Sequence, residues 1–490
     1  MRYLTFICWI TYQYWRRGGE DSWTGYLEYA KRVEAAIVLG NLVVARNTTG
    51  LVGSDSAPAV LAPGTSVELK LTVGQIATGI YSNAAEQLGY FERHTDASVP
   101  HLTRERGMVL ARLFDEAICD TDLGKRLAEP DLPDSASYEE LKEFGNCVHI
   151  REIPRQEQEI LLAAILPTTP TSPAERRRLA TYGIFLHCVS EDNARHHSQS
   201  FWTEVTRADR QLPKGMAFAM DGWMRYLIRD MLAVVHEYAF YTLVNALPHG
   251  ENREREFLTA SEAVSSVFQT AETINQALRD LRLLADDESW ANLSISELTN
   301  RISVLTSREQ IEENGLRRWV GGLHESDVIR VSQQYTSAAP ALLPVAWLLS
   351  ERRANPGAGD QTVPMPDLSH EGVNRIGLSQ VIVPRLAKFR QAEVTWANAA
   401  GEIMVFTVEQ HLRTAWGRLA SERKEVSVIL SDGNRWAWRK WFGAGRTASR
   451  HVQVASWLRQ LGLLDDTSLT PTGEHYREQI VTTLILGDDQ

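Results

Sequence analysis

The sequence contains few cysteines, and they lie far apart. Four occur in 490 residues, at Cys8, Cys119, Cys147 and Cys188, and no two of them form a C-x-x-C pair. Disulfide frameworks and zinc ribbons need closely spaced cysteines, so we expect neither here. Scattered thiols of this kind are typical of a protein that stays reduced in a cytoplasm.

The motifs of common enzymes are also missing. The chain has no G-x-x-x-x-G-K-[ST] phosphate loop and no G-x-S-x-G nucleophile elbow. His-Glu occurs three times, but no second histidine follows at the spacing of a zinc-protease helix. We therefore expect no cofactor, no metal ion and no catalytic residue, and we favour a binding subunit over an enzyme.

A membrane-spanning stretch is not evident at the N-terminus. The aromatic run from Tyr3 to Trp15 is too short to cross a bilayer, and Arg16 and Arg17 follow it. A secretory signal would carry its positive charges first. The run predicts a buried first helix that lacks a capping turn, so the natural domain is expected to begin upstream. We expect a cytoplasmic protein without membrane contact.

Positive charge is scarce overall. The formal net charge is −11 and the isoelectric point about 5.7, so any nucleic-acid binding must come from a local basic patch. The composition is otherwise that of a globular protein, with 43% hydrophobic and 23% charged residues and 14 Trp. Indole rings of that number can fill several layers of packed helices.

The dominant period is helical, which predicts a mainly α protein built around a helical bundle. Met220 to Ala239, Phe257 to Leu281 and Leu298 to Trp319 place apolar residues at i, i+3, i+4 and i+7. Val331 to Ser350 has the same period, but Pro340 and Pro344 must kink or split it.

Three segments rich in Gly, Pro, Ser and Thr divide the chain, at 47–66, 167–173 and 355–374. They predict an N-terminal helical domain (1–166), a central helical bundle (174–354) and a C-terminal helical domain (375–490). Winged-helix-like modules are expected near both ends, at about 66–118 and within the C-terminal domain.

Two segments carry a shared signature that predicts these modules. In 81–118 a predicted helix is followed by GYFE, a turn and LTRERG; in 454–480 a helix is followed by GLL, a shorter turn and LTPTG. A glycine ends a helix in the left-handed conformation at no steric cost. Two short strands around the turn would form the wing, and the Thr and Gly would lead into the next helix.

A basic and aromatic stretch, 433–451, precedes the C-terminal signature and contains no acidic residue. We interpret it as helix, glycine turn and second helix, which with the wing would complete a DNA-binding module. Winged helices also serve as protein adaptors, so DNA and a protein partner both stay open. The residues expected to contact DNA are Arg435, Arg439, Lys440, Arg446, Arg450 and His451.

One pairing resembles a metal-dependent nuclease. Asp131 is followed by Glu140 and Lys142, the residue types that hold Mg²⁺ and steady a water in such enzymes. Those enzymes place them on adjacent strands. Here residues 137–144 have helical composition and begin with a capping serine, so a divergent nuclease is the weakest alternative.

The order of parts resembles that of large helical proteins of unknown function encoded among bacterial phage-defence and restriction genes. The resemblance rests on RYLTFICWITYQYW, YAKRVEAAIVLGN and the wing-like LGYFE … LT … G, in the first third of the chain and its tail. It implies a non-enzymatic DNA-binding or adaptor subunit of an anti-phage or anti-plasmid complex, beside a separate ATPase or nuclease. In that family a short stretch precedes the aromatic helix, and this chain lacks it. The alternative is a kleisin-like bridging subunit of an SMC-type ATPase, because those also have winged helices at both ends.

Overall fold

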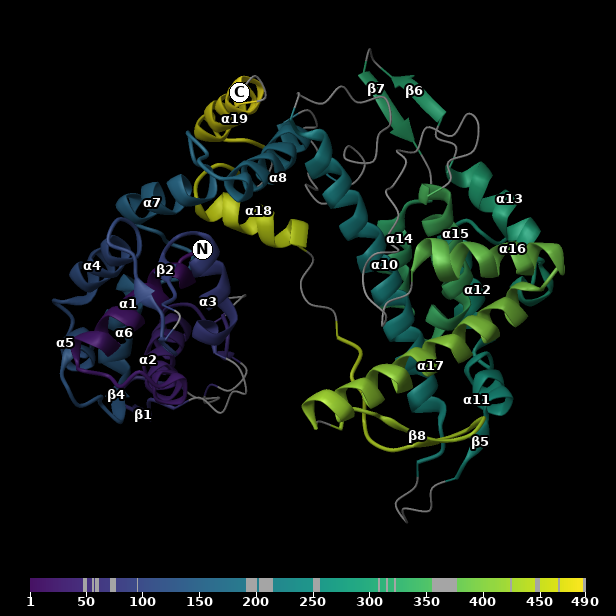
Figure 1. Cartoon of the computed structure of the whole chain (residues 1–490), viewed down its shortest axis with the longest axis horizontal. Coiled ribbons are helices and arrows are strands. Elements are labelled where there is room, and N and C mark those ends of the chain that lie inside the picture. Colours follow the sequence, from purple (N-terminus) through teal and green to yellow (C-terminus); the bar gives the residue numbers. More distant parts are fainter. Residues whose placement is uncertain are drawn as a thin grey trace. The chain divides into compact units, whose positions relative to one another are not determined.

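The computed structural model describes residues 1–46, 51–54, 57, 61–70, 76–94, 96–190, 201, 215–249, 256–306, 309–313, 316–320, 323–354, 377–423, 425–445, 450–465 and 468–487. They form two compact units: unit 1 is Met1–Arg195 with Arg450–Gln490, and unit 2 is His196–Ser449. The prediction of a mainly α protein is confirmed (Figure 1). The boundary differs from the proline-rich one expected at 167–173, and the expected loop at 355–374 lies outside the described residues.

Unit 1 joins the first and last parts of the chain. Its helices are α1 (Tyr3–Arg16), α2 (Trp23–Val44), α3 (Ala77–Gln87), α4 (Gly107–Ile118), α5 (Asp122–Ala128), α6 (Tyr138–Cys147), α7 (Arg155–Ile165), α8 (Pro173–Ser190), α18 (Arg450–Gln460) and α19 (Pro471–Gly487). Two antiparallel strand pairs accompany them, β1 (Ser66–Glu68) with β4 (Ser135–Ser137) and β2 (Phe91–Glu92) with β3 (His101–Leu102). The yellow α19 packs on α8, although more than half of the sequence separates them (Figure 1).

The predicted first helix is α1, and most of its surface is buried. It packs against α4, while α2 packs against α6. Gly145 of α6 lies so close to α2 that a Cβ there would approach the Gly40 carbonyl oxygen to 2.2 Å. The absence of both side chains therefore allows the two helix backbones to touch.

A fully buried ion pair ties α1 to α7. The side chains of Arg2 and Glu157 are each 1% exposed, and Nη2 lies 3.1 Å from Oε1. Arg2 also donates to the backbone oxygens of His149 and Cys147, each at 2.8 Å. A buried charge is tolerated when it is paired and its donors are satisfied, and these contacts fulfil both conditions.

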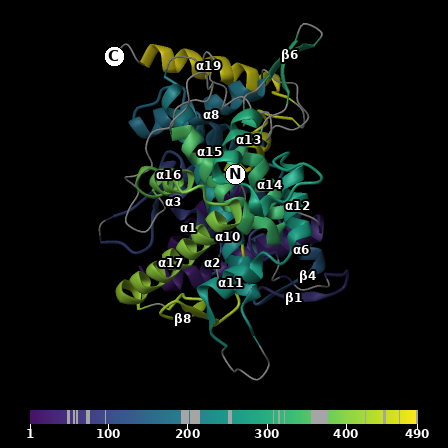
Figure 2. The same cartoon turned by 90° about the vertical axis from the view of Figure 1, so that its right-hand side faces the viewer.

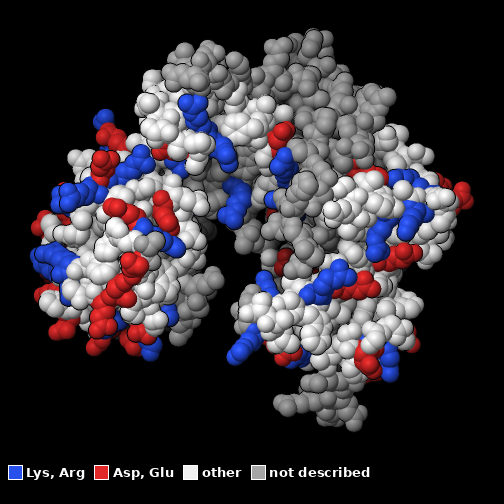
Figure 3. Space-filling model, in the orientation of Figure 1, with Lys and Arg blue, Asp and Glu red and all other residues white. Residues whose placement is uncertain are grey.

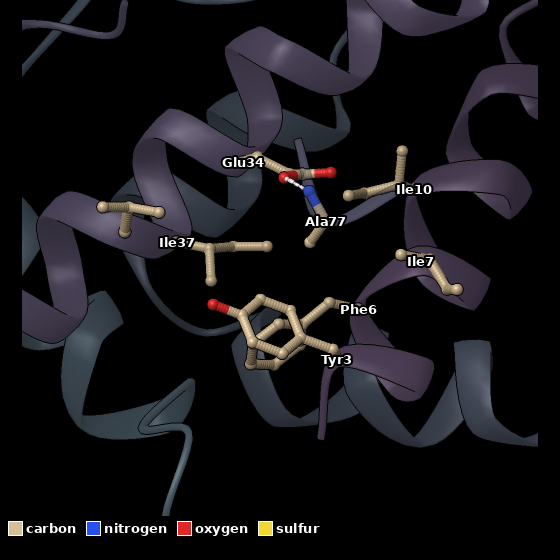
Figure 4. Close-up of a pocket in the computed structure, with 8 residues that line it drawn as sticks. Tyr3, Phe6, Ile7, Ile10, Glu34, Ile37 and Ala77 are labelled. Carbon is tan, nitrogen blue, oxygen red and sulfur yellow. Dashed lines mark hydrogen bonds between the residues drawn. The ribbon is translucent and has the colours of Figure 1, made fainter. Parts of the chain in front are cut away.

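A buried carboxylate caps α3 from another helix. The residue before α3 is Ile76, whose side chain cannot accept a hydrogen bond. Glu34 of α2 accepts instead from the backbone N–H of Ala77 at 2.7 Å (Figure 4) and from that of Thr78, also at 2.7 Å. Burial raises the pKa of Glu34, opposed by these hydrogen bonds. The cavity between Glu34 and α1 measures about 10 Å³, which holds at most one water and no ligand.

The repeated signature folds in the same way at both positions. Gly89 and Gly462 have φ of +74° and +72° and end α3 and α18. After each glycine a short hairpin follows, β2–β3 in one copy and the Leu464–Leu469 bridge in the other. Thr103 and Thr470 then donate through Oγ1 to the oxygens of these same glycines, at 2.7 and 2.6 Å.

The second glycine of each copy is required by close packing. A Cβ on Gly107 would lie 2.1 Å from the Tyr90 oxygen, and one on Gly473 would lie 2.1 Å from the Leu463 oxygen. Each glycine N–H also donates to the threonine Oγ1 of its own copy, at 3.1 and 3.0 Å. The two segments are therefore equivalent helix–hairpin–helix repeats, whose hairpins differ in length.

Unit 2 is a helical bundle with one small sheet. Its helices are α10 (Ala217–Ala246), α11 (Ala260–Val267), α12 (Ala271–Asp280), α13 (Ile295–Thr306), α14 (Glu325–Gln334), α15 (Ala339–Ala354), α16 (Val383–Gln391) and α17 (Trp396–Glu422), with short turns η2 (Trp290–Asn292), η3 (Thr336–Ala338) and η4 (Leu378–Ile382). Strands β5 (Leu258–Thr259), β9 (Arg435–Trp438) and β8 (Ile429–Asp432) form an antiparallel sheet in that order, and β6 (Glu309–Glu313) pairs with β7 (Leu316–Val320).

The centre of unit 2 is the group α10, α14, α15 and α17, which lie side by side in both views (Figures 1 and 2). The helical period predicted α10 correctly. The expected split of 331–350 is confirmed, since α14 ends at Gln334 and α15 begins at Ala339, with Pro344 inside it. Trp319 was expected to continue a helix but lies in β7. None of the described helices is long and apolar enough to cross a membrane.

We expect removal of the buried Arg2 charge to destabilise unit 1 strongly. Arg2→Met leaves the Glu157 carboxylate buried without a partner, so the free energy of unfolding should fall by about 3–5 kcal/mol. The matched control is Arg155→Met, because Arg155 and Glu159 form an ion pair with side chains 90% and 63% exposed. That variant should lose about 0.5 kcal/mol or less. Equal losses in urea denaturation would contradict the role assigned to Arg2.

We expect Gly473→Ala to destabilise unit 1 by about 1–3 kcal/mol, because the added Cβ collides with a backbone oxygen that cannot move independently. The control is Gly79→Ala in α3, where a Cβ meets nothing within 4 Å. That change should be neutral or stabilising, since alanine favours the helix. The midpoint temperature of thermal unfolding should fall in Gly473→Ala and stay the same or rise in Gly79→Ala. An unchanged midpoint in Gly473→Ala would contradict the steric argument.

Candidate nucleic-acid interface

The basic and aromatic stretch begins with the turn and second strand of a hairpin, and residues 439–445 follow without helix or strand, so the first helix of the predicted helix-turn-helix is wrong; the second is present as α18. Residues 435–438 form β9, which pairs with β8 on one side and β5 on the other. Trp436 and Trp438 are two residues apart, which is the strand period. Gly433, with φ of +61°, and Asn434 make the two-residue turn between β8 and β9. Both signals were present in the sequence.

The structure separates the six predicted contact residues. Arg435, Arg439 and Lys440 belong to unit 2, whereas Arg450 and His451 belong to unit 1. Arg446 lies outside the described residues. The six residues are therefore not shown to form one patch, and we describe the two groups separately.

Arg435 and Lys440 are exposed, and Arg439 is half-buried. Arg435 donates from Nη2 to the Phe257 oxygen at 3.1 Å, which holds its side chain along β5. The guanidinium of Arg439 forms an ion pair with Glu425. Two exposed cations thus lie on this hairpin and the segment that follows it.

A β-bulge follows β9. The backbone N–H groups of Arg439 and Lys440 both donate to the Val428 oxygen, at 3.1 and 3.2 Å. Two residues oppose one, which bends a strand and redirects the side chains after it. Trp441, which follows the bulge, is 65% exposed.

Three aromatic rings meet beside the bulge. The ring centroid of Trp441 lies 5.5 Å from that of Trp438 and 4.8 Å from that of His249, with interplanar angles of 73° and 76°. His249 follows α10, and its Nδ1–H donates to the Leu247 oxygen at 2.9 Å. These contacts fix the orientation of the Trp441 ring. We call Trp438, Trp441 and His249 the aromatic cluster.

The segment after β9 rests on α10 and α17. Phe442 packs on Phe240 of α10 with centroids 5.3 Å apart, and Phe240 packs on His411 of α17 at 4.5 Å. The Val428 N–H donates to His411 Nε2 at 3.3 Å, and the Gly445 N–H donates to Glu237 at 3.2 Å. Both helices therefore hold this surface in place.

Acidic residues from outside the basic and aromatic stretch lie near these cations. Glu425 forms an ion pair with Arg439. The pKa of Glu262 is lowered mainly by hydrogen bonds from Thr259, and the nearby charge of Arg435 lowers it further. The acid-free sequence thus does not give an acid-free surface. Figure 3 shows positive and negative side chains interspersed over the visible face, without a large field of one sign.

The residues in unit 1 do not match the prediction equally. Arg450, the first residue of α18, is exposed and near Tyr81, where burial raises the tyrosine pKa and the Arg450 charge opposes that rise. His451 is only 5% exposed, so its expected contact with DNA is wrong. The reason is helical spacing, because His451 shares a face with the buried Val454, Ala455 and Leu458.

The nuclease-like pairing does not assemble. Ser137 caps the start of α6, as the sequence predicted, and Glu140 completes a capping box with it. Glu140 also accepts from Arg126 Nη1 at 2.6 Å, so its carboxylate is occupied. Among the described residues, no group of three or more His, Cys, Asp and Glu is arranged to hold a metal ion.

The sequence did not reveal His249, His411 or Glu425 as members of this surface. His249 follows α10, His411 lies in α17 and Glu425 follows α17, and no local pattern distinguishes them. Nothing in the sequence around His249 predicted contact with tryptophans almost two hundred residues later.

A buried histidine forms hydrogen bonds that connect α10, α15 and α17. His236 of α10 accepts at Nε2 from Trp347 Nε1–H at 2.9 Å. Its Nδ1–H donates to Thr407 Oγ1 at 2.7 Å, and Thr407 donates to the Ile403 oxygen. Burial lowers the pKa of His236 to about 3, so the ring is neutral. Burial and the Lys440 charge lower the pKa of His411 to about 4.

Comparisons with models of protein families, with curated proteins and with solved structures found no match to this chain.

We expect unit 2 to lose stability as the pH falls below about 6.5. The unfolded chain protonates His236 near its ordinary pKa, whereas the folded state resists until about pH 3. Its contribution is complete above pH 6.5 and should have fallen by about 2 kcal/mol at about pH 5. Urea denaturation at about pH 7.5 and about pH 5 measures this difference.

The matched variant is His236→Gln, which keeps an acceptor for Trp347 but does not titrate in this range. It should show a smaller loss between the two pH values than the parent protein. The exposed His475 supplies the control, since His475→Gln should leave the pH dependence unchanged. An identical pH dependence in His236→Gln and the parent would disprove the contribution of His236.

Proposed function

We propose that this protein is a non-enzymatic DNA-binding or adaptor subunit of a bacterial anti-phage or anti-plasmid defence complex. The observation that carries the DNA-binding part is the surface after β9. It presents an indole that is 65% exposed, and two exposed cations belong to the same hairpin and the segment after it, since Arg435 begins β9 and Lys440 precedes Trp441 in the chain. Nucleic-acid surfaces combine these groups, because cations bind phosphates and flat rings contact bases. The defence setting rests on the family resemblance alone.

The adaptor part of the proposal is supported by the helix–hairpin–helix repeats. We infer that both are winged-helix-like, since each has a helix ended by a left-handed glycine, a hairpin and a Thr-to-Gly entry into the next helix. Neither hairpin carries the predicted basic patch. We therefore assign unit 1 to contacts with other subunits, such as a separate ATPase or nuclease, and unit 2 to DNA.

One observation favours this proposal over a kleisin-like bridging subunit. A bridging subunit must place its two ends on two different ATPase heads. Here the first and last parts of the chain fold into one unit, and the Gln158 side chain donates to the Gln460 oxygen at 3.2 Å. Ends held together in one unit are better suited to a single partner. Co-purification with proteins encoded by adjacent genes would test the choice.

We expect the full chain to bind a DNA duplex that has a single-stranded tail. The variant is Arg435→Ala with Lys440→Ala, which should weaken binding because each cation contacts a phosphate. The slope of log affinity against log salt should fall by up to about two units over roughly 50–200 mM salt. Fluorescence anisotropy of a labelled DNA measures both quantities.

The control removes the same charge elsewhere, through Arg112→Ala with Lys31→Ala, both exposed in unit 1. That variant should bind like the parent. An absence of DNA binding in the parent, or equal losses in the two double variants, would contradict the proposal. If the protein nicks DNA in the presence of Mg²⁺, and Asp131→Ala and Lys142→Ala each abolish this activity, the nuclease alternative is established instead.

A further inference from the structure

Trp441 is a large apolar side chain that the fold keeps outside the core. A flat ring pressed onto a surface has one face covered, so an exposure of 65% leaves at least one indole face open to solvent. The ring is nevertheless held, because Trp438 and His249 contact it at steep angles of 73° and 76°. A fixed and open aromatic face loses little conformational entropy when another ring stacks on it.

The aromatic cluster is not shaped to enclose a cation. Aromatic cages surround a quaternary ammonium with separated rings. Here the three centroids are 4.8, 5.5 and 5.7 Å apart, so the rings touch one another and leave no space between them. The exposed Lys440, which precedes Trp441 in the chain, would also repel a positive ligand. The ligand that fits is therefore a flat ring attached to negative charge.

The charge balance disfavours a duplex. Binding to duplex DNA through its backbone needs several cations that reach phosphates. On this surface Arg439 is paired with Glu425, and Arg435 is near Glu262. Lys440, the residue before Trp441 in the chain, is exposed, and its charge also acts on His411 of α17. Few phosphate contacts and an open ring are the features of single-strand binding, where each stacked base contributes about 1–3 kcal/mol.

We propose that Trp441 and Lys440 bind an unpaired nucleotide of a single-stranded nucleic acid. The base stacks on the open face of Trp441, and the phosphate of the same or the next nucleotide contacts the Lys440 ammonium. This deepens the proposed function and rests on it, because it names the form of nucleic acid that unit 2 binds. The site prefers single strands to duplex, and it has little sequence preference, since every base has a face that can stack.

The test compares four labelled ligands of about 15 nucleotides by anisotropy with the full chain. They are oligo(dT), oligo(rU), an abasic strand that retains the phosphates, and a duplex of the same length. Oligo(dT) or oligo(rU) should bind at least about 10-fold more tightly than the abasic strand and the duplex, which corresponds to one stacked base. The ratio of the affinities for oligo(dT) and oligo(rU) shows whether the site prefers DNA or RNA.

The variants separate stacking from charge. Trp441→Ala should weaken binding of the single strand about 5- to 100-fold and leave the abasic strand unchanged. Trp441→Phe should retain most of the affinity, because a smaller ring still stacks. The control is Trp416→Ala: Trp416 of α17 is 69% exposed but lies about 140° around the helix from His411. It should bind like the parent, and far-UV circular dichroism should show all three variants folded.

The outcomes distinguish this inference from the proposed function. Binding of tailed DNA with no effect of Trp441→Ala, or with equal affinity for duplex and abasic strand, overturns the stacking site while DNA binding stands. Equal losses in Trp441→Ala and Trp416→Ala also overturn it, because they indicate unspecific aromatic adhesion. Binding of oligo(rU) alone, lost in Trp441→Ala, supports the stacking site and contradicts the DNA-binding proposal. A protein partner that is lost in Trp441→Ala, with no nucleic acid bound, overturns both.

Discussion

Arg2 is a guanidinium with almost no access to water, and unit 1 is arranged so that its donors are satisfied. Glu157 comes from α7, while the backbone oxygens of Cys147 and His149 come from the end of α6 and the turn after it. An unpaired charge at this position would cost several kcal/mol, so α1, α6 and α7 cannot move apart independently. The same constraint recurs at Glu34, which caps α3 from α2, and at His236, which joins α10 to α15 and α17. In each case one buried polar group fixes the relative positions of several helices.

The rigid helices of unit 2 explain why an irregular surface can be well defined. Residues 439–445, which follow β9, have no helix or strand, yet Phe442 packs on α10 and the Gly445 N–H donates to Glu237. A bulge redirects the chain after Trp438, and His249 stops the Trp441 ring from rotating. Binding groups on loops are effective when a rigid scaffold positions them. The neutral His236 network belongs to that scaffold, so acid should loosen the binding surface together with the bundle.

Charge on this surface illustrates how folding changes the meaning of a sequence pattern. Residues 433–451 contain five basic residues and no acid, a pattern typical of contact with duplex phosphates. In the folded chain Glu425 and Glu262 approach two of those arginines. The exposed aromatic ring thereby becomes the more distinctive feature of the surface. For that reason we assign recognition mainly to stacking and only a minor part to counterion release.

Local patterns in the sequence determined the α class, the first helix, α10, the Ser137 capping box and the two glycine-ended repeats. Each depends on residues a few positions apart, whose contacts follow from helix and turn geometry alone. Tertiary structure decided the rest. Trp436 and Trp438 lie in a strand because β5 pairs with β9, and Arg435 contacts Phe257 across 178 positions. His451 is buried because the stripe it shares with Val454 and Leu458 packs into unit 1. Burial, strand pairing and neighbouring charge depend on residues that only the fold brings together, so no local pattern could predict them.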